Sequence, residues 1–426
     1  MAQTEFNICI GDLGIEVGTL WFEANGARQH STFQYSQSWL SNPRRFAIAP
    51  AIALSENRFF FKADDEMSSP LPPPLADASP DSWGRNIIRR QARALSPNAT
   101  PLNECDYISA IDDFSRIGAL RLKDPKTGKF IATNSHSHKH DEIPPLLQLD
   151  EMRRIIALVE ENDLDGDDHV LLTNLVAAAG SLGGARPKCS VIDKAGILYI
   201  AKFTSVRDQM PVEVAEVLTL ELARQCGLNT PQATLDKHGK HAVALIKRFD
   251  RNDKGRLPYI SAQTMLQRPD ATSGTYEELA QSIRAYSDNP LRDLNELFMR
   301  IAFTILVSNV DDHLKNHGFL YQGKEKWRLS PLFDVNPAPE RHKELKTAIS
   351  AISGTTASIE TLIEHSLFFE IIKDKAVAQI SHMAEIIATN WRGLASQYGM
   401  TNKDINAYRS AFEHDEMTLA LKLLKS

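Results

Sequence analysis

At 426 residues, the chain is long enough to form two or three units that each have a hydrophobic core. Hydrophobic residues make up 42% of it and charged residues 24%, proportions typical of a globular protein and not of a disordered one. The formal net charge of −6 argues against a protein that grips nucleic-acid phosphates over a large face by itself. A local basic patch, or a basic partner, is still compatible with that charge.

The sequence contains no signature of a membrane or secreted protein. No apolar run approaches the roughly 20 residues that a membrane helix needs, and the first residues lack the basic and apolar regions of a secretory signal. Four cysteines, Cys9, Cys105, Cys189 and Cys226, lie far apart without a C-x-x-C pair. This spacing favours reduced thiols over disulfides or a zinc site, and we expect a cytoplasmic protein.

Roughly the first 60 residues predict a small antiparallel sheet, because short β-like runs such as N-I-C-I and V-G-T-L-W-F alternate with Gly and Asn. The proline-rich stretch from Ser68 to Pro80 is incompatible with a helix or a central strand, so we interpret it as a rigid surface connection. Binding to a proline-recognising module is the alternative. A helix is expected to begin near Gly84.

Two polar segments imitate metal sites. The segment from Thr133 to Asp141 has three histidines at alternating positions, but we interpret it as a solvated loop and a domain boundary. The three aspartates between Asp163 and Asp167 imitate a calcium-binding loop, whose sixth position should be Gly and whose twelfth should be Glu. Here those positions hold Asp168 and Asn174, so we reject a calcium site.

From about residue 150 onward the pattern mixes helices and strands, and beyond residue 275 it is mostly helical. The fold class is therefore α+β, with a β-rich N-terminal part (1–145), a mixed α/β part (146–250) and a mainly helical part (251–426). The elements expected in the middle part are helices at 150–161 and 169–179, strands at 189–193 and 196–203, a helix from Pro211 to Cys226, and a hairpin around D-K-H-G-K.

The octet N-V-D-D-H-L-K-N, residues 309–316, contains two adjacent acids. Asp311 and Asn316 have the Asp-x-x-x-x-Asn spacing of phosphoryl-transfer loops, in which the Asp accepts a hydroxyl proton and the Asn holds Mg²⁺. Asp312 does not have this spacing, and we interpret it as a solvated neighbour. A hairpin-like segment after Asn316 leads to Asp334, which would supply a second metal-binding carboxylate. The alternative, that the two acids merely end a helix, is disfavoured because acids are poorly placed at a helix C-terminus.

Two further features suit a nucleotide. Lys202 lies in a strand, G-I-L-Y-I-A-K-F, whose two faces are both largely apolar, so its ammonium needs a ligand or a partner. The following helix carries Glu213, Glu216 and Glu221, and Glu216, which lies on its apolar stripe, is the carboxylate expected to point inward. The alternative is that Lys202 reaches solvent at the end of the strand.

The turn G-S-L-G-G-A-R-P-K, residues 180–188, matches neither common phosphate-binding motif. The backbone N–H groups of Gly183 and Gly184 could still approach phosphates, with Arg186 or Lys188 as the nearby charge. Ser181 adds a hydroxyl to this turn, although serine is an ordinary turn residue.

In their order along the chain, these motifs resemble the HipA-type serine/threonine kinases, which are the toxins of HipBA toxin–antitoxin modules. The motifs are G-S-L-G-G-A-R-P-K, Y-I-A-K-F, G-L-N-T-P, K-R-F-D-R, N-V-D-D-H-L-K-N and S-P-L-F-D-V. The resemblance is strong over residues 150–340, and the first 90 or so residues are similar too, through V-G-T-L-W-F and P-D-S-W-G-R-N. It implies a two-lobed, protein-kinase-like fold with the nucleotide-binding part at 146–250 and the catalytic lobe at 251–426.

The resemblance also implies roles for individual residues. Asp311 would be the catalytic base, Asn316 and Asp334 the Mg²⁺ ligands, and Lys202 the contact to the ATP phosphates, with Glu216 as its partner. The phosphate-side loop would be Gly183, Gly184, Ala185, Arg186, Pro187 and Lys188, and His313 with Lys315 would line the nucleotide site. The hinge would be Lys247, Arg248 and Phe249. Its backbone groups would bind adenine, so variation of the side chains there would cost little.

The family's biology is implied in the same way. Ser181 falls where family members autophosphorylate and thereby silence themselves, and repulsion between a phosphoserine and ATP explains that effect. Family members phosphorylate an aminoacyl-tRNA synthetase. They are neutralised by a small helix-turn-helix antitoxin, HipB, through which alone this acidic chain would meet DNA.

Two other functions remain open. The Asp–Asn–Asp trio does not identify the acceptor, so a kinase for a small molecule or a lipid is one alternative. A catalytically silent scaffold for antitoxin and DNA is the other. The presence of all four of Asp311, Asn316, Asp334 and Lys202 disfavours the scaffold.

Overall fold

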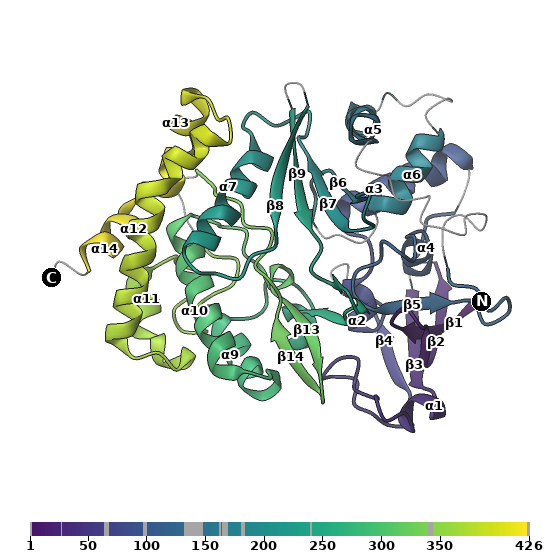
Figure 1. Cartoon of the computed structure of the whole chain (residues 1–426). Coiled ribbons are helices and arrows are strands. Elements are labelled where there is room, and N and C mark those ends of the chain that lie inside the picture. The colour runs from purple at the N-terminus through teal and green to yellow at the C-terminus, as the bar shows by residue number, and fades with distance from the viewer. Residues whose placement is uncertain are drawn as a thin grey trace. The chain divides into compact units, whose positions relative to one another are not determined.

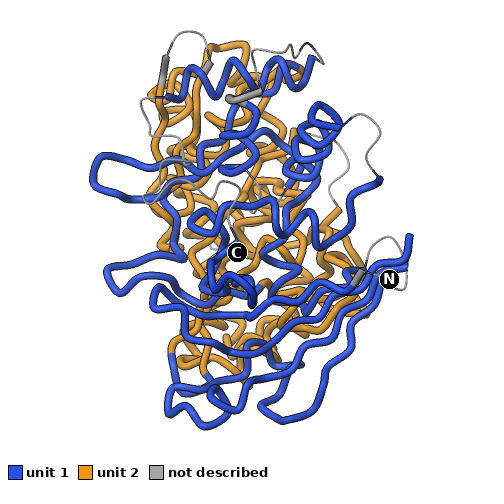
Figure 2. Tube along the Cα trace, turned by 90° about the vertical axis from the view of Figure 1, so that its right-hand side faces the viewer, with its two compact units in different colours: residues 1–206, 247–260, 323–325 blue, residues 207–246, 261–322, 326–426 orange. Residues whose placement is uncertain are grey.

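The computed structural model describes residues 2–26, 28–63, 68–96, 100–131, 148–161, 163, 169–179, 184–238, 241–339 and 344–423. The chain divides into two compact units (Figure 2). The first contains residues 1–206, 247–260 and 323–325, and the second contains residues 207–246, 261–322 and 326–426. Each unit is thus built from separate stretches of sequence, and each is described by itself below.

The first unit begins with a five-stranded antiparallel sheet, which confirms the sheet predicted from the alternating N-terminal runs. Residues at every second position, such as Leu20 and Phe22, are buried. Gly18 is required for strand pairing, because a Cβ there would lie 2.2 Å from the carbonyl oxygen of Gln34. The strand order is β4-β3-β2-β1-β5, with bounds β1 Ala2–Ile10, β2 Ile15–Asn25, β3 Arg28–Tyr35, β4 Phe59–Lys62 and β5 Leu120–Lys123.

The helices of the first unit include one that the sequence did not predict. The proline-rich stretch contains helix α2 (Pro73–Asp77), so the interpretation of Ser68 to Pro80 as free of helix is wrong. Proline at the first helical position lacks only an N–H that has no intrahelical partner, which permits a short helix here. The others are α1 Gln37–Leu40, α3 Ser82–Leu95, α4 Glu104–Ser109, α5 Leu149–Glu161 and α6 His169–Ala179 (Figure 1).

Two hairpins complete the first unit. Strands β6 (Lys188–Ile192) and β7 (Leu198–Phe203) pair antiparallel, as predicted, and Gly196 makes their turn at φ +82°. Strands β10 (Arg251–Asn252) and β11 (Gly255–Arg256) form a much shorter pair. Helix α6 packs against both α3 and β6. The predicted polar loop at Thr133–Asp141 and residues 164–168 of the rejected calcium loop lie outside the described residues.

The second unit is mainly helical. Helix α12 is the longest helix described and packs against α7, α13 and α14, while α9 packs against α10 (Figure 1). Strands β8 and β9 form the predicted hairpin, and β13 pairs with β14. The helices are α7 Val212–Gln225, α8 Ala262–Met265, α9 Tyr276–Tyr286, α10 Pro290–Leu306, η3 Leu314–Asn316, α11 Ile359–Glu364, η4 Ser366–Phe369, α12 Lys373–Gln397, α13 Asn402–Phe412 and α14 Asp415–Lys422. The strands are β8 Ala233–His238, β9 His241–Lys247, β13 Gly318–Gly323 and β14 Lys326–Leu329, and the short β12 (Tyr259–Ser261) precedes α8.

Within the described residues, no helix combines the length and the apolar composition that crossing a membrane requires. All four cysteines are buried free thiols.

Candidate functional site

The segment from Asn309 to Asn316, here called the Asp–Asn loop, follows directly on helix α10. The direction in which the chain enters this loop is set by Ser308, which adopts a left-handed conformation at φ +54° and turns the chain away from the helix. Such a conformation is uncommon for a residue other than glycine. The Ser308 hydroxyl also donates a hydrogen bond of 2.9 Å to the carbonyl oxygen of Ala411 at the end of α13. The loop therefore starts from a point held by two helices of the same unit.

The two adjacent acids of the loop face opposite environments. Asp311 is exposed, whereas Asp312 is only 3% exposed. The Oδ2 atom of Asp312 accepts hydrogen bonds from the hydroxyls of Tyr276 and Thr304 and lies 3.1 Å from Nε2 of His317. The interpretation of Asp312 as a solvated neighbour is therefore wrong. Its partners come from three other segments of the unit, which the spacing of the loop alone cannot reveal.

The carboxyl group of Asp312 is held in its ionised form. Burial by itself would raise its pKa, but the charge and hydrogen bond of His317, together with the hydrogen bond from Tyr276, lower that pKa below the ordinary value for aspartate. An ionised carboxylate can only accept hydrogen bonds, so the proton between the two side chains lies on Nε2 of His317. The buried side of the loop is thus an anion surrounded by donors.

Asn316 closes the loop against Asp311. Its Nδ2 atom donates a hydrogen bond of 3.1 Å to the carbonyl oxygen of Asp311, and the N–H of His313 donates to the same oxygen at 3.0 Å. The loop is also tied outward, because the N–H of Leu314 donates to the carbonyl oxygen of Ala271 at 2.9 Å. With its Nδ2 engaged, Asn316 offers the oxygen Oδ1 as its ligand atom.

Asp334 belongs to a segment that is hydrogen-bonded to the start of the Asp–Asn loop. The N–H of Asn336 donates to Oδ1 of Asn309 at 3.3 Å, and the N–H of Ala338 donates to the carbonyl oxygen of Ser308 at 3.0 Å. Asp334 itself is half-buried and has a positive φ of +57°. Strained residues of this kind cluster at ligand sites. The structure therefore brings the segments of Asp311, Asn316 and Asp334 together within one unit.

Polar atoms without partners gather in these same segments. Within the described part of the chain, Nδ2 of Asn309, Nδ1 of His313 and Oδ1 of Asn336 are buried and lack a hydrogen-bond partner. Buried atoms of this kind call for a water, an ion or a ligand. The exposed Lys315 adds a positive charge to the loop.

The oxygens offered here suit a hard cation. Carboxylate and amide oxygens, completed by water and substrate phosphates, are what Mg²⁺ prefers. The described residues contain no group of three or more His, Cys, Asp or Glu side chains able to hold a metal ion by themselves. Asn316 and Asp334 thus fit a metal that is shared with a bound phosphate.

In the first unit, Lys202 on β7 is buried and lies directly opposite Lys188 on β6. Directly opposed residues share one face of a hairpin, and like charges in such positions repel. Nζ of Lys188 lies 3.8 Å from Oδ2 of Asp81. Because Lys202 is only 8% exposed, the alternative that it reaches solvent at the strand end is wrong. This face of the hairpin therefore carries two buried basic side chains.

Helix α7 of the second unit carries two deeply buried glutamates where one was expected. Glu216 is 2% exposed, as predicted, but so is Glu213. The apolar stripe could not distinguish them because α7 is buried on nearly every face. Glu221 instead pairs with Arg224 at 2.6 Å. Lys202 belongs to the other unit, so its pairing with Glu216 remains a prediction.

At the predicted hinge, the side chain of Arg248 is an anchor. Its guanidinium donates to both oxygens of Asp250, at 2.9 and 2.6 Å, and to the carbonyl oxygen of Ser115. Its backbone N–H donates to the carbonyl oxygen of Leu198 at 3.0 Å. The expectation that side-chain variation at the hinge costs little is therefore wrong for Arg248. The two flanking residues, Lys247 and Phe249, are only half-buried.

The predicted phosphate-side loop is described only in part, because Ser181 and Gly183 lie outside the described residues. Gly184 is exposed and has φ +91°, a conformation that glycine adopts without strain. Ala185 is exposed and Arg186 half-buried. Pro187 is buried next to β6, where its carbonyl oxygen accepts a hydrogen bond from the N–H of Phe203.

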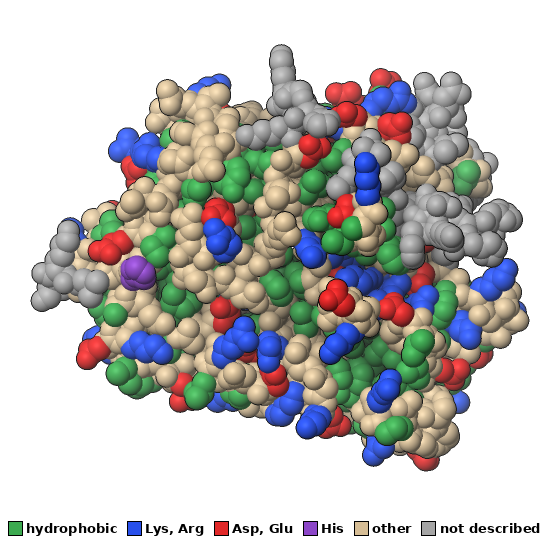
Figure 3. Space-filling model, in the orientation of Figure 1, with side chains coloured by type: hydrophobic (Ala, Val, Ile, Leu, Met, Phe, Trp, Pro, Cys, Tyr) green, Lys and Arg blue, Asp and Glu red, His purple; other side chains and the backbone are tan. Residues whose placement is uncertain are grey.

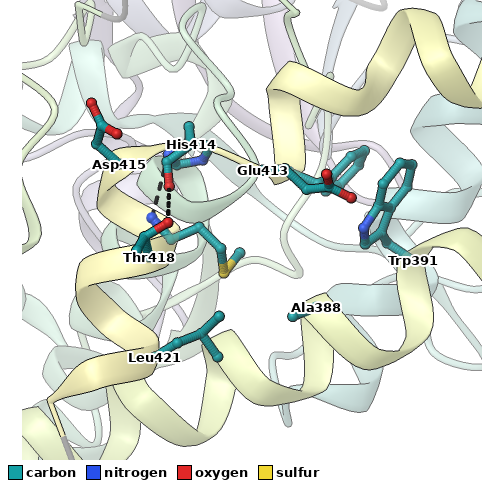
Figure 4. A pocket seen from close by; sticks show the side chains of 9 residues that line it. Ala388, Trp391, Glu413, His414, Asp415, Thr418 and Leu421 are labelled. Carbon is teal, nitrogen blue, oxygen red and sulfur yellow. Dashed lines mark hydrogen bonds between the residues drawn. The ribbon is translucent and has the colours of Figure 1, made fainter.

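A cavity of about 440 Å³ lies among the C-terminal helices and contains none of the predicted site residues. Figure 4 shows Ala388 and Trp391 of α12 on one side of it and Thr418 and Leu421 of α14 on the other. The candidate site is thus defined by the motif residues and not by this cavity.

The sequence model of the HipA-like C-terminal domain matches residues 180–392, and that of the HipA N-terminal domain matches residues 8–123. A putative kinase of Haemophilus influenzae is 28% identical over 144 residues, which cover 29% of this chain and 42% of that protein. The putative kinase Y4dM of Sinorhizobium fredii is 31% identical over 134 residues, 31% of each chain. The chain thus spans less than half the length of either curated relative.

Among solved structures, the chain is similar to one titled as the Shewanella oneidensis MR-1 toxin–antitoxin system HipA, HipB and operator DNA complex. The match covers 99% of this chain and 96% of that chain, with a TM-score of 0.69 and 15% sequence identity. At this identity the likeness establishes the fold.

Fold and site together define an α+β protein with a kinase-like fold, which confirms the predicted fold class. Both domains typical of HipA are present, and the chain belongs to the HipA family.

Proposed function

We propose that this protein is an ATP- and Mg²⁺-dependent serine/threonine protein kinase, the toxin of a type II toxin–antitoxin module. The observation that supports the proposal most is the arrangement of Asp311 and Asn316 in the Asp–Asn loop. Asp311 turns its carboxylate to solvent, while Asn316 uses its Nδ2 atom to hold the Asp311 carbonyl oxygen and keeps Oδ1 for a ligand. This arrangement fits a base beside a metal-binding amide.

Asp311 is the proposed catalytic base. Its carboxylate has no hydrogen-bond or ion-pair partner among the described residues, so it is free to accept the proton of a substrate hydroxyl. The backbone of Asp311 is nevertheless fixed, because its carbonyl oxygen accepts two hydrogen bonds. A rigid backbone with an unengaged carboxylate suits a group that must meet an incoming hydroxyl.

Mg²⁺ would be held by Oδ1 of Asn316 and the carboxylate of Asp334. When bound, the ion supplies charge that neutralises the phosphate oxygens during transfer. The hydrogen bond from Nδ2 of Asn336 to Oδ1 of Asp334, at 3.3 Å, orients that carboxylate. The orphaned Nδ1 of the nearby His313 would find a partner in bound nucleotide or water.

The first unit would contribute the other nucleotide contacts. Lys202, with Glu216 as its expected partner, would bind the ATP phosphates, and the glycine-rich segment 183–188 would approach them through its backbone. The backbone of residues 247–249 would bind adenine. Lys202 is buried and shares its face of the hairpin with Lys188, and this basic face supports the assignment.

The substrate and partners follow from family membership. We expect the acceptor to be an aminoacyl-tRNA synthetase, autophosphorylation on Ser181, and a small HipB-like helix-turn-helix antitoxin that carries the DNA contacts. Basic and acidic side chains are interspersed over the face seen in Figure 3, and the net charge of −6 also favours indirect DNA contact.

The test is to incubate the purified protein with labelled ATP and Mg²⁺, alone and with a cell lysate, and to map the transferred phosphate by mass spectrometry. Label on Ser181 and on one lysate protein, absent with Asp311→Asn, is expected. Label confined to small molecules or lipids would favour the alternative kinase. Absence of nucleotide turnover in every lysate would contradict kinase activity altogether and favour the silent scaffold.

A further inference from the structure

The second acid of the loop, Asp312, has a role that the phosphoryl-transfer spacing does not assign. Its Oδ2 atom is shared by donors from helix α9 (Tyr276), helix α10 (Thr304) and the residue just after the loop (His317). The Asp312 carbonyl oxygen accepts a fourth hydrogen bond, of 2.9 Å, from the hydroxyl of Thr347. One residue therefore joins four separate segments of the unit.

This junction is rigid as well as buried. Tyr276 is fully buried, and its ring packs edge-on against the imidazole of His317 at 5.7 Å between centroids. The His317 carbonyl oxygen accepts a hydrogen bond of 2.7 Å from the N–H of Ala262 at the start of α8. The rings of Tyr276 and His317 thus pack on each other, and the backbone of His317 is tied to α8.

Asp311 and Asp312 are adjacent, so their Cα atoms lie about 3.8 Å apart across one planar peptide. Fixing the side chain and the carbonyl oxygen of Asp312 leaves the preceding residue little freedom. The exposed carboxylate of Asp311 has no hydrogen bond of its own among the described residues to hold it in place. Its position depends on the backbone on both sides, and Asp312 supplies the anchor on the C-terminal side.

We propose that Asp312 is the positioning residue for the catalytic base, and that it acts through its hydrogen bonds with Tyr276 and His317. The proposal rests on the proposed kinase function. In reactions that depend on orientation, a misplacement of about 1 Å can cost roughly 10²-fold in rate. Loss of this anchor should therefore reduce the rate of transfer far more than it reduces nucleotide binding.

The test compares three variants: Asp312→Asn, Tyr276→Phe and the control Asp293→Asn. Asp293 is also a buried aspartate of the second unit, 2% exposed, and accepts hydrogen bonds from the Ser287 hydroxyl and the Leu329 N–H. It lies outside the proposed site, so its loss measures what removal of a buried carboxylate does to the fold alone.

The expected result is a split between kcat and KM. Asp312→Asn should lower kcat by roughly 10- to 100-fold and Tyr276→Phe by up to about 10-fold, with the KM for ATP within about twofold of wild type. Asp293→Asn should lower the melting temperature with an unchanged kcat. Wild-type kcat in Tyr276→Phe, or a loss in Asp312→Asn no greater than in Asp293→Asn, would overturn the proposal. If Asp312→Asn does not fold, Tyr276→Phe decides alone.

A second readout does not require activity. The amides of His313, Leu314 and Asn316 are hydrogen-bonded within or beside the loop. Their hydrogen exchange should accelerate in Tyr276→Phe and Asp312→Asn but not in Asp293→Asn. If wild-type protein transfers no phosphate, the kinase function fails while the exchange data still test the anchor. Unchanged exchange in an active enzyme would refute the anchor alone.

Discussion

Asp250 in the first unit and Asp312 in the second are both buried aspartates that hold a loop, but their partners differ. Asp250 is paired with Arg248 and Arg251, each at 2.6 Å, and accepts the N–H of Gly118 at 2.7 Å. Asp312 is surrounded by two hydroxyls and a histidine. One loop is therefore fixed by the charges of two arginines and the other by two hydroxyls and one histidine.

The different partners of Asp250 and Asp312 fit the different roles that we propose for the two loops. The guanidinium of arginine remains charged at any physiological pH and forms fixed, forked hydrogen bonds, so it suits a permanent scaffold. Hydroxyls and a histidine hold a carboxylate without strong fixed charges. The comparison predicts which replacements unfold the protein and which impair only the reaction.

The largest effect on stability is expected from Asp250→Ala. It would leave the buried guanidinium group of Arg248 and the half-buried one of Arg251 without their counter-ion, and loss of one partner of a buried pair typically costs about 3–5 kcal/mol. Chemical denaturation should show this loss in the free energy of unfolding. The exposed Asp311→Ala is the control and should stay within about 0.5 kcal/mol of wild type. A change of under 1 kcal/mol in Asp250→Ala would refute the scaffold role.

Asp312→Ala should cost less, roughly 2–3 kcal/mol, because the hydroxyls of Tyr276 and Thr304 can reorient when their acceptor is removed. The same denaturation series measures it. A loss equal to that of Asp250→Ala would show that the two centres are energetically alike and would remove the contrast between them.

The contributions of Asp250 and Asp312 to stability should differ in their dependence on acidic pH. At Asp250 burial alone would raise the pKa, but the charges of Arg248 and Arg251 bring it well below the usual value. An unfolded aspartate has a pKa of about 3.9, so the ionised carboxylate stabilises the fold above that pH, and this contribution is lost as the pH falls toward the folded-state pKa.

The free energy of unfolding of the wild type should therefore fall steeply below about pH 4. Asp250→Asn should lose much less stability over the same interval, and Asp312→Asn should resemble the wild type more closely, since Asp250 is intact in it. Denaturation from pH 7 to pH 3 measures all three proteins. Parallel curves for wild type and Asp250→Asn would contradict the assignment.

The smallest effect is expected at the entry to the Asp–Asn loop. Ser308→Ala removes one hydrogen bond to the carbonyl oxygen of Ala411 and should cost about 1 kcal/mol. Its melting temperature, compared with that of Thr304→Val, would show whether the loop is held more from its start or from Asp312. No change in Ser308→Ala would mean that the C-terminal helices do not brace the loop.

Local sequence patterns predicted most of the elements. Spacing alone chose Asp311 over Asp312 as the base, which stays a prediction, and left Asp312 as a solvated neighbour, which is wrong. What the sequence could not reveal depends on distant partners. Asp312 is bonded to Tyr276, 36 positions earlier, and Arg248 to Ser115, 133 positions earlier. No periodicity within a single element contains that information.

Two smaller misses have local reasons. Helix α2 formed in a proline-rich stretch because its proline stands at the start of the helix. Glu213 was ranked below Glu216 because a stripe argument assumes one solvated face, and α7 has almost none. The buried His317, two residues before the apolar Phe319, was a signal that a polar partner had to lie near the loop.

The central claim is that one aspartate of the loop performs the chemistry while the other holds the loop. It is tested most directly by single-turnover transfer of labelled phosphate from Mg²⁺–ATP by wild type and Asp311→Asn on the same lysate. A general base contributes roughly 10²- to 10⁴-fold, so Asp311→Asn should lose at least 10²-fold in rate with an unchanged melting temperature. Transfer at the wild-type rate by a folded Asp311→Asn protein would contradict the account.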